Sequence, residues 1–185
     1  MDNSVKLQDI IDSKILNERK VFLWGQVDDD SAKHVIDRLL YLEMVQPGKE
    51  IQLIINSPGG YVTSGLAIYD TMKSISSPIS TICSGLAASM GSIILSAGEK
   101  GRRFVLPHAR VMIHQPSGGA DGPASDIEIQ IEELLKTKKL GAEILAKNCG
   151  KTVDEIMKDF NRDYWMSAGE SVEYGIVDGQ LDRLV

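Results

Sequence analysis

Short apolar runs alternate with longer segments of helical spacing along most of the chain. The runs are rich in β-branched residues and predict buried strands at Val21 to Trp24, Ile51 to Ile55 and Ile79 to Cys83. Between them, apolar positions recur every three or four residues after the Asp28–Asp30 cluster and over 62–75, which predicts helices. Strand–helix–strand alternation with short connections predicts parallel strands covered by helices, an α/β fold.

The second half of the chain continues this alternation. We expect a helix of small residues from about Ala87 to Ala97, and strands near Phe104 to Leu106 and Val111 to Ile113. Capping boxes predict the starts of three more helices, at Ser125–Glu128, Thr152–Glu155 and Ser167–Glu170. The helix from Ser125 is unusually long, because its pattern runs to about Asn148 before Gly150 ends it.

Length and composition predict one α/β domain spanning residues 1–185. The chain has 185 residues, 43% of them hydrophobic, which is enough for one substantial core and too little for two ordinary domains. Its net charge of −6 argues against a nucleic-acid binder, which needs a basic surface. Apolar runs fall short of the roughly 18 residues of a membrane span, and the first residues do not have the pattern of a signal peptide. We therefore expect a soluble protein that is not exported.

Cysteine and histidine positions change this picture little. Cys83 and Cys149 are far apart and lack CxxC spacing, which fits a reduced cytoplasm better than a disulfide framework. The three histidines, His34, His108 and His114, form neither an HExxH motif nor a His/Cys cluster. The sequence therefore predicts no metal site.

Ser89 is a candidate nucleophile because it lies where a buried strand gives way to a helix. Its small neighbours let a substrate backbone approach, and the N–H groups of a helix start favour the negative charge of a tetrahedral oxyanion. In isolation, a serine at a helix start is far more often a cap. The spacing also differs from the G-x-S-x-G elbow, since Ala87 occupies the first glycine position.

The Ser57–Gly60 turn has the same context as the Ser89 segment. An isolated Ser-Pro-Gly-Gly sequence is usually an ordinary turn, but this one follows a buried strand and precedes a helix. Two such turns at one edge of a parallel sheet form a crevice, which is where α/β proteins usually bind ligands. The glycines can direct N–H groups at a carbonyl oxygen.

A general base and an acid are less well determined by the pattern. His114 directly follows the apolar run Val111 to Ile113, so it stands at a strand end, and geometry favours it slightly over His108. Spacing does not choose among the acids, which are Asp70, Asp121, Asp126, Asp163 and Asp178.

Taken together, these segments resemble the Clp protease (ClpP) family. The matching pieces occur in family order from about Ser13 to Asp178, and they are Ile55–Gly60, Ile68–Met72, Ser80–Cys83, Ala87–Gly91, Arg110–Pro116, Asp126–Ile129 and Glu173–Gly175. The resemblance implies a serine endopeptidase that hydrolyses unfolded proteins to short peptides. It also implies site roles: Ser89 as nucleophile, His114 as base, Asp163 as acid, and the backbone N–H groups of Gly60 and Met90 as the oxyanion hole.

The same resemblance implies an architecture and a partner. The fold is expected to be a crotonase-like spiral, with residues of about 124–148 as a handle helix that interlocks two stacked heptameric rings. A Clp AAA+ unfoldase would deliver polypeptides and use ATP itself, so we expect no cofactor in this chain, which lacks G-x-x-x-x-G-K-[ST]. An extended substrate is expected to add as a strand between the segments near Val62 and Ser117.

The sequence departs from the family pattern in three places. The stretch before Phe22–Gly25 is shorter than the family's usual segment that forms axial loops, so we expect altered pore gating. In the family, the pocket that receives an unfoldase loop usually includes aromatic residues at three positions that are Gln52, Ile54 and Ser74 in this chain. Without these aromatics we expect weak docking of the unfoldase. An acidic residue often precedes the Arg-Asp pair in the family, but this chain has Asn161 at that position. We expect the replacement to affect the ion pairing of Arg162.

Two other functions are compatible with the same residues. The chain could be a structural or regulatory ring subunit that assembles with an active paralogue, although an intact triad argues against an inactive subunit. It could also be an acyl-CoA enzyme of the wider crotonase-like fold, which uses an oxyanion hole but does not require Ser89 and His114.

Overall fold

The sheet is mixed, with mostly parallel strands and one antiparallel strand at its side. The structure is a computed structural model and describes residues 6–184. Within those residues the sheet has seven strands. They are β1 (Lys20–Trp24), β2 (Ile51–Ser57), β3 (Ile79–Ala88), β4 (Arg103–Val105), β5 (Arg110–Ile113), β6 (Tyr164–Met166) and β7 (Gly179–Gln180).

Strand order follows the chain at first and then branches. Strands β1, β2, β3, β4 and β7 pair in that order, all of them parallel. Strand β5 pairs parallel with the last residues of β3, and β6 pairs antiparallel with β5. The predicted α/β class and parallel strands are confirmed, whereas β6 is a strand that the sequence pattern did not predict.

Strand β3 is longer than predicted because it pairs with two different strands in succession. Its first part pairs with β4, and Leu86–Ala88 pairs with β5. Between the two parts lies Gly85, whose φ of +96° is a conformation that glycine adopts readily. The prediction of a helix from Ala87 was therefore wrong at its start, since that residue continues the strand and helix α4 begins at Met90.

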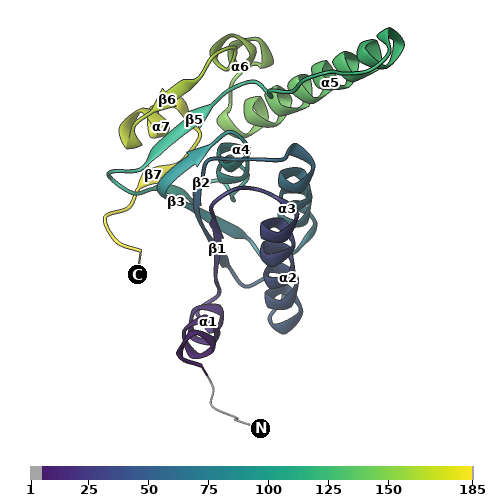
Figure 1. The fold of residues 1–185 in the computed structure, drawn as a ribbon. Helices are drawn as coiled ribbons and strands as arrows, with labels where there is room; N and C mark the ends of the chain where they lie inside the picture. The colour runs from purple at the N-terminus through teal and green to yellow at the C-terminus, as the bar shows by residue number, and fades with distance from the viewer. Residues whose placement is uncertain (1–5, 185) are drawn as a thin grey trace.

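Helices cover both sides of the sheet (Figure 1). They are α1 (Leu7–Asn17), α2 (Asp29–Val45), α3 (Val62–Ser74), α4 (Met90–Ser96), α5 (Ala124–Cys149), α6 (Val153–Asp159) and α7 (Ala168–Tyr174). Helices α2 and α3 lie side by side, and α4 packs between the sheet and the base of α5. Helix α1 contacts β1 and was not predicted, because no element was expected before Val21.

Side-chain caps begin several of the helices where the sequence placed them. The Asp28 carboxylate accepts a hydrogen bond from the Ser31 N–H at 2.8 Å, and the boxes at Thr152 and Ser167 both form. The box at Ser125 does not form, because Pro123 precedes the helix and the chain is already helical at Ala124. Helix α5 ends at Gly150, whose φ of 70° is the left-handed conformation expected of a C-cap glycine.

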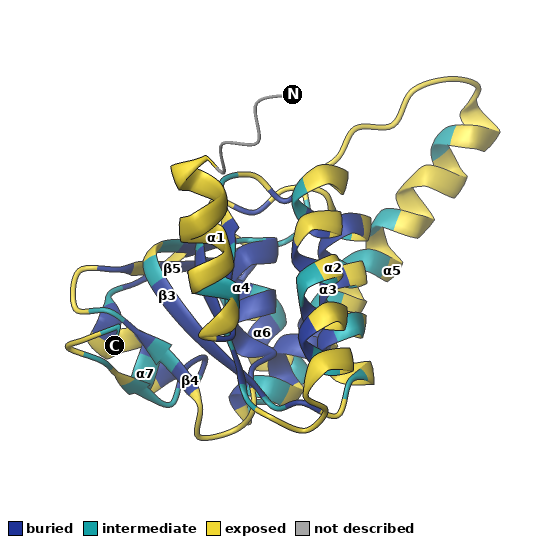
Figure 2. Ribbon diagram, turned by 90° about the horizontal axis from the view of Figure 1, so that it is seen from below, coloured by how far each residue is buried: buried dark blue, intermediate teal, exposed yellow. Residues whose placement is uncertain are grey.

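Burial divides helix α5 into two parts (Figure 2). Its C-terminal part, including Ala142 and Leu145, packs into the core, whereas its N-terminal part projects away and leaves Ile129 and Leu135 each 59% exposed. The core itself is one contiguous cluster that joins the sheet to the surrounding helices. None of the helices in residues 6–184 has both the length and the hydrophobicity needed to cross a membrane.

Candidate active site

Ser89 lies in a strained turn between β3 and α4. Its φ and ψ are 53° and −123°, and Arg19 is the other non-glycine residue with positive φ among those described. The Ser89 N–H donates to the Met112 carbonyl at 2.9 Å, so the turn is tied to β5. Residues with side chains rarely adopt this conformation, which is found preferentially at functional sites.

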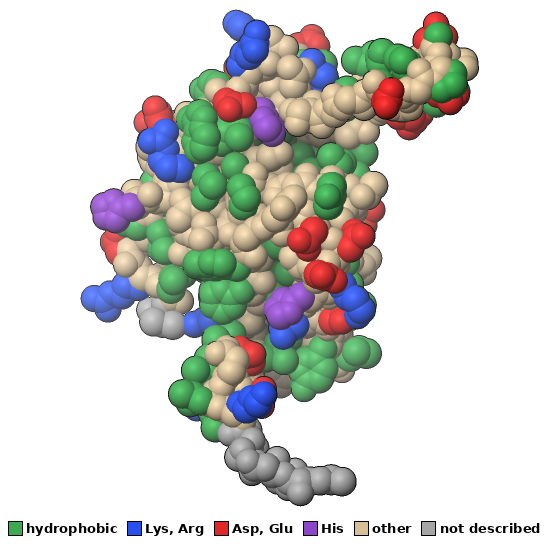
Figure 3. Space-filling model, in the orientation of Figure 1, with side chains coloured by type: hydrophobic (Ala, Val, Ile, Leu, Met, Phe, Trp, Pro, Cys, Tyr) green, Lys and Arg blue, Asp and Glu red, His purple; other side chains and the backbone are tan. Residues whose placement is uncertain are grey.

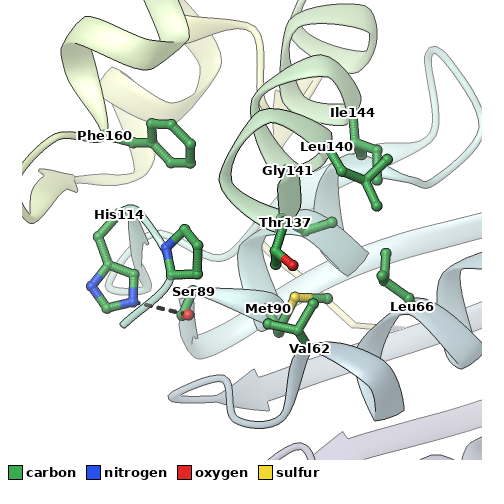
Figure 4. A pocket seen from close by; sticks show the side chains of 12 residues that line it. Val62, Leu66, Ser89, Met90, His114, Thr137, Leu140, Gly141, Ile144 and Phe160 are labelled. Atoms are coloured by element: carbon green, nitrogen blue, oxygen red, sulfur yellow. Dashed lines mark hydrogen bonds between the residues drawn. The ribbon is translucent and has the colours of Figure 1, made fainter. Parts of the chain in front are cut away.

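His114 reaches Ser89 because of the pairing between β3 and β5. The parallel register places Ala88 beside Met112. Ser89 follows Ala88, and His114 follows Met112 by two residues, so both lie beyond the same end of the paired strands. Its Nε2 is 2.9 Å from the Ser89 Oγ, a hydrogen-bonding distance (Figure 4). The imidazole side chain is 26% exposed, so it is sheltered and still open to a substrate.

Asp163 reaches His114 through a different pairing. Strands β5 and β6 are antiparallel, and Ile113 lies opposite Tyr164. His114, which follows Ile113, therefore faces Asp163, which precedes Tyr164. The Asp163 Oδ1 is 3.0 Å from the His114 Nδ1. A hydroxyl, an imidazole and a carboxylate are thus hydrogen-bonded in series.

Gln115 holds the segment that precedes Asp163. Its backbone N–H donates to the Phe160 carbonyl at 2.6 Å, and its side-chain Nε2 donates to the Asn161 carbonyl at 2.9 Å. Strand β6 fixes the chain on the other side of Asp163. The carboxylate is 59% exposed, so these backbone contacts, more than burial, determine where it lies. The sequence analysis did not identify Gln115.

The two turns that were predicted to lie together are in contact. A Cβ on Gly59 would lie 2.6 Å from the Ser89 Cβ and 2.7 Å from the Ala88 carbonyl oxygen, closer than packed atoms approach. Gly59 has a φ of +90°, and its N–H donates to the Ser57 Oγ at 3.1 Å. The absence of a side chain at Gly59 therefore lets this turn lie directly against Ser89.

The predicted donors of the oxyanion hole are the backbone N–H groups of Gly60 and Met90, which directly follow Gly59 and Ser89 in the two adjoining turns. In the bridge with Gly60, Val27 donates to the Gly59 carbonyl and accepts from the Tyr61 N–H, which directs the Gly60 N–H away from Val27. Met90 is the first residue of α4, so its N–H has no acceptor within the helix.

The competing candidates lie elsewhere. His108 lines a separate pocket with Gly85 and Asp182. Asp178 forms a salt bridge to Arg103 at 2.6 Å. Within residues 6–184 the His114 side chain has hydrogen-bond partners in Ser89 and Asp163, and Asp70, Asp121 and Asp126 are not among them.

The cysteines do not compete with Ser89 as nucleophiles. Both are buried and free. Burial raises the pKa of the Cys83 thiol to about 12 and that of the Cys149 thiol to about 11. At neutral pH both are therefore protonated, and a thiol is a much weaker nucleophile than a thiolate.

An apolar pocket opens beside Ser89 (Figure 4). Residues from α3, α4, the base of α5 and the segments after β5 and α6 line it, namely Val62, Leu66, Ser89, Met90, Ile93, His114, Pro116, Thr137, Leu140, Gly141, Ile144 and Phe160. Val62 is one of the two residues predicted to bind substrate. The other, Ser117, lines a wider groove that also contains His114 and Asp163. The α5 residues and Phe160 carry no local pattern that would have identified them.

A serine hydroxyl, an imidazole and a carboxylate that are hydrogen-bonded in this order, on an α/β sheet and beside an apolar pocket, form the arrangement found in hydrolases of the serine type. The family model for Clp protease matches residues 3–183, which is nearly the whole chain. The chain therefore belongs to the Clp protease family, and the mixed α/β fold is that of a ClpP-type serine peptidase.

Proposed function

We propose that this chain is a serine endopeptidase subunit that hydrolyses unfolded polypeptides to short peptides. The observation that carries the proposal is the continuous series of hydrogen bonds from Ser89 to His114, at 2.9 Å, and from His114 to Asp163, at 3.0 Å. Membership of the Clp protease family supports a peptidase rather than an acyl-CoA enzyme.

The mechanism follows from these positions. Ser89 Oγ attacks the peptide carbonyl while His114 Nε2 takes its proton, and His114 then gives that proton to the leaving amine. Asp163 accepts a hydrogen bond from His114 Nδ1–H, which selects the tautomer with a basic Nε2. The N–H groups of Gly60 and Met90 stabilise the tetrahedral oxyanion. Water then hydrolyses the acyl-enzyme by the same route.

An extended substrate would lie between the segments near Val62 and Ser117. The residues from Pro116 to Ala120 form no helix or strand, so their backbone groups are not used in secondary structure and can pair with a peptide. Pairing through backbone atoms accepts many sequences. This supports a broad range of unfolded substrates.

Assembly into two stacked heptameric rings is part of this proposal. The projecting part of α5 exposes apolar side chains, including Ile129, Ile131 and Leu135. Figure 3 shows hydrophobic and acidic side chains gathered near the end of this arm. Exposed apolar groups in a cluster favour contact with a partner surface, and the handle of a second ring is the partner that the family supports.

A Clp AAA+ unfoldase is the proposed source of the polypeptide, and ATP would be used by that partner. Within residues 6–184 no cluster of three or more metal-ligating side chains is present. The proposed mechanism uses only side chains and backbone groups of this chain and water, and so does not require a cofactor.

A second candidate function is that of a regulatory subunit in a ring shared with an active paralogue. The observation that favours it is the polar character of Gln52 and Ser74. The Gln52 Oε1 is buried without a hydrogen-bond partner in the described residues, and Ser74 is an exposed residue at the end of α3. A surface of this kind would bind an apolar unfoldase loop weakly.

Substitution of Ser89 by alanine tests the proposed function. We expect Ser89→Ala to lower hydrolysis of a fluorogenic peptide by roughly 10⁴-fold or more, because the nucleophile is lost. Assembly, measured by native mass spectrometry, should be unchanged, because the substitution removes one small hydroxyl group.

Labelling with a serine-reactive phosphonate separates the two candidate functions. An active subunit should be modified at Ser89 in the folded wild type, and heat-unfolded protein serves as the control because it lacks the His114 contact. Absence of labelling in the assembled protein would favour the regulatory role. Retention of more than a tenth of the peptidase activity by Ser89→Ala would show that the nucleophile is another residue.

A further inference from the structure

The pairing of β2 with β3 is interrupted shortly before Ser89. Ile55 lies beside Cys83, and Ser57 lies beside Ala87, so one residue of β2 spans the same length as three residues of β3. Extra residues in one strand are left unpaired and disrupt the ladder locally. Other groups must therefore hold β3 in place at the interruption.

Asn56 is the residue of β2 at the interruption, and its side chain supplies an acceptor there. Its Oδ1 accepts a hydrogen bond from the Leu86 N–H at 3.1 Å. Its backbone carbonyl accepts from the N–H of Gly25, the residue after β1, at 2.9 Å. The backbone of Asn56 thus bonds to one neighbouring segment, and its side chain bonds to the other.

Gly85 allows this side-chain contact. A Cβ on Gly85 would lie 2.9 Å from the Asn56 Oδ1, which is closer than packed atoms approach. Gly85 also has a φ of +96°, a conformation that glycine adopts readily. The amide of Asn56 therefore reaches the backbone of β3 because the residue before Leu86 has no side chain.

Leu86 lies three residues before the nucleophile. On one side, the segment Leu86–Ala88 pairs with β5, and the Ser89 N–H donates to the Met112 carbonyl at 2.9 Å. On the other side, Asn56 holds the segment against β2. The chain that enters the strained turn at Ser89 is therefore restrained from two directions, and substitution can remove the restraint from Asn56 because a side chain makes it.

We propose that Asn56 is a positioning residue that determines where the Ser89 Oγ lies relative to His114. Within residues 6–184, Asn56 makes no hydrogen bond to Ser89, His114 or Asp163, so it acts through the backbone that it holds at Leu86. A displacement of about 1 Å at a catalytic group can lower the rate by roughly 100-fold. The proposal rests on the proposed peptidase function and adds a residue that supports the nucleophile.

Asn56→Leu tests this role, because leucine has a similar shape and no acceptor. We expect kcat for a fluorogenic peptide to fall by roughly 10- to 100-fold with little change in KM. Labelling of Ser89 by a serine-reactive phosphonate should slow by a similar factor, because it depends on the same nucleophile. Asn56→Asp keeps an oxygen acceptor for the Leu86 N–H, and its kcat should stay close to that of the wild type.

Amide hydrogen exchange reports the contact itself. The Leu86 N–H should exchange slowly in the wild type and in Asn56→Asp, and faster in Asn56→Leu. Asn17→Leu is the matched control, because it makes the same change at an exposed position of α1. Its kcat and its exchange at Leu86 should equal those of the wild type.

Two outcomes overturn the proposal: an unchanged kcat in folded Asn56→Leu, and equal losses of kcat in Asn56→Leu and Asn56→Asp. A lower melting temperature with an unchanged kcat would show that Asn56 contributes to stability only. Asn56→Ala removes the acceptor without filling space, and it replaces Asn56→Leu if that variant does not fold. If the wild type cleaves no peptide, the proposed function itself fails; a wild-type kcat in Asn56→Leu refutes only the role of Asn56.

Discussion

Ser89 combines a strained backbone with a hydrogen-bonded side chain. Its positive φ directs the chain from β3 into α4, and the bond from its N–H to Met112 holds this conformation. Strain of this kind is maintained only where the surrounding structure enforces it. Here the β5 strand provides that restraint and leads directly into His114, so the backbone strain at Ser89 and the position of His114 have one origin.

The roles of the acid and the base can be tested by a pair of substitutions. We expect Asp163→Asn to lower kcat by about 10³- to 10⁴-fold, because an amide at this position can favour the wrong imidazole tautomer. His108→Ala should leave kcat nearly unchanged, since His108 lies in another pocket. The measurement is steady-state hydrolysis of one fluorogenic peptide by both variants.

Circular dichroism of both variants provides the control for folding. Strong loss of activity on changing His108, together with tolerance of the change at Asp163, would refute both assignments.

At the scale of elements, the active site depends on two strand pairings. Strand β3 meets β5 in parallel, which brings Ser89 to His114, and β5 meets β6 antiparallel, which brings Asp163 to His114. The segment between α6 and β6 is held on its other side by Gln115. Asp163 is therefore positioned from both ends of a short segment.

Substitution of Gln115 tests this positioning. Gln115→Met keeps the length of the side chain and removes the bond to the Asn161 carbonyl. We expect kcat to fall by roughly 10- to 100-fold with little change in KM, because a small displacement of a catalytic group has effects of this size. The double variant with Asp163→Asn should be no slower than Asp163→Asn alone, since both changes act through the same carboxylate.

Additive losses in this double-mutant cycle would contradict the role of Gln115 as a positioning residue. A fall in melting temperature without a change in kcat would indicate that Gln115 contributes to stability only.

At the scale of the whole molecule, Arg103 joins elements that are distant in sequence. Its guanidinium is 1% exposed and donates to Asp178, to the Ser96 carbonyl at the end of α4, and to the Asn148 carbonyl near the end of α5. Asp178 precedes β7. One buried cation thus connects the C-terminal segment to the helices that support the active site.

Removal of the Asp178 charge should destabilise the fold. We expect Asp178→Asn to lower the free energy of unfolding by about 3 kcal/mol at pH 7, because it leaves Arg103 buried without its counter-charge. The double variant Arg103→Met/Asp178→Leu should be more stable than Asp178→Asn, since no charge is then left unpaired. Urea unfolding measures both.

The pH dependence provides a check on the same pair. Burial alone would raise the pKa of Asp178, but hydrogen bonds from Arg103 and the charge of Arg103 outweigh it, so the pKa lies below its ordinary value. The stabilisation is therefore complete above the unfolded-state pKa of about 3.9 and is lost as the pH falls through the lower folded-state value. The difference between wild type and Asp178→Asn should shrink below about pH 4. A difference that stays constant from pH 7 to pH 3 would contradict this account.

Partner docking is also a property of the whole assembly. We expect homomeric particles to respond poorly to a Clp unfoldase. Substitution of Gln52 and Ser74 by aromatic residues should improve degradation of a folded substrate by about 10-fold or more, because a buried aromatic anchor contributes about 1 to 2 kcal/mol. Ile54 is 2% exposed and so offers little surface of its own to a loop. Several loops that bind one ring would multiply the effect.

Peptide hydrolysis without unfoldase is the control, because it does not depend on docking. Efficient unfoldase-dependent degradation by the unmodified particle alone would refute this prediction.

Local features of the sequence determined much of the fold. The β-branched runs were correctly predicted as the strands β1, β2 and β3. Helix caps were correctly predicted at Asp28, Thr152 and Ser167. Both predictions succeed because strand propensity and capping depend on residues within one strand or one turn. Motif order was enough to identify the Clp protease family, which the family match confirms. The roles of the individual site residues remain predictions.

Only the tertiary structure decided which distant residues meet. Spacing left several aspartates open as partners of His114, and the register of β5 with β6 brings Asp163 to it across 49 positions of sequence. The extension of β3 through Ala88 likewise depends on its pairing with β5, which overrides the local preference for helix. Local propensity carries no information about such register and packing, because they are set by contacts between segments that are far apart in the chain.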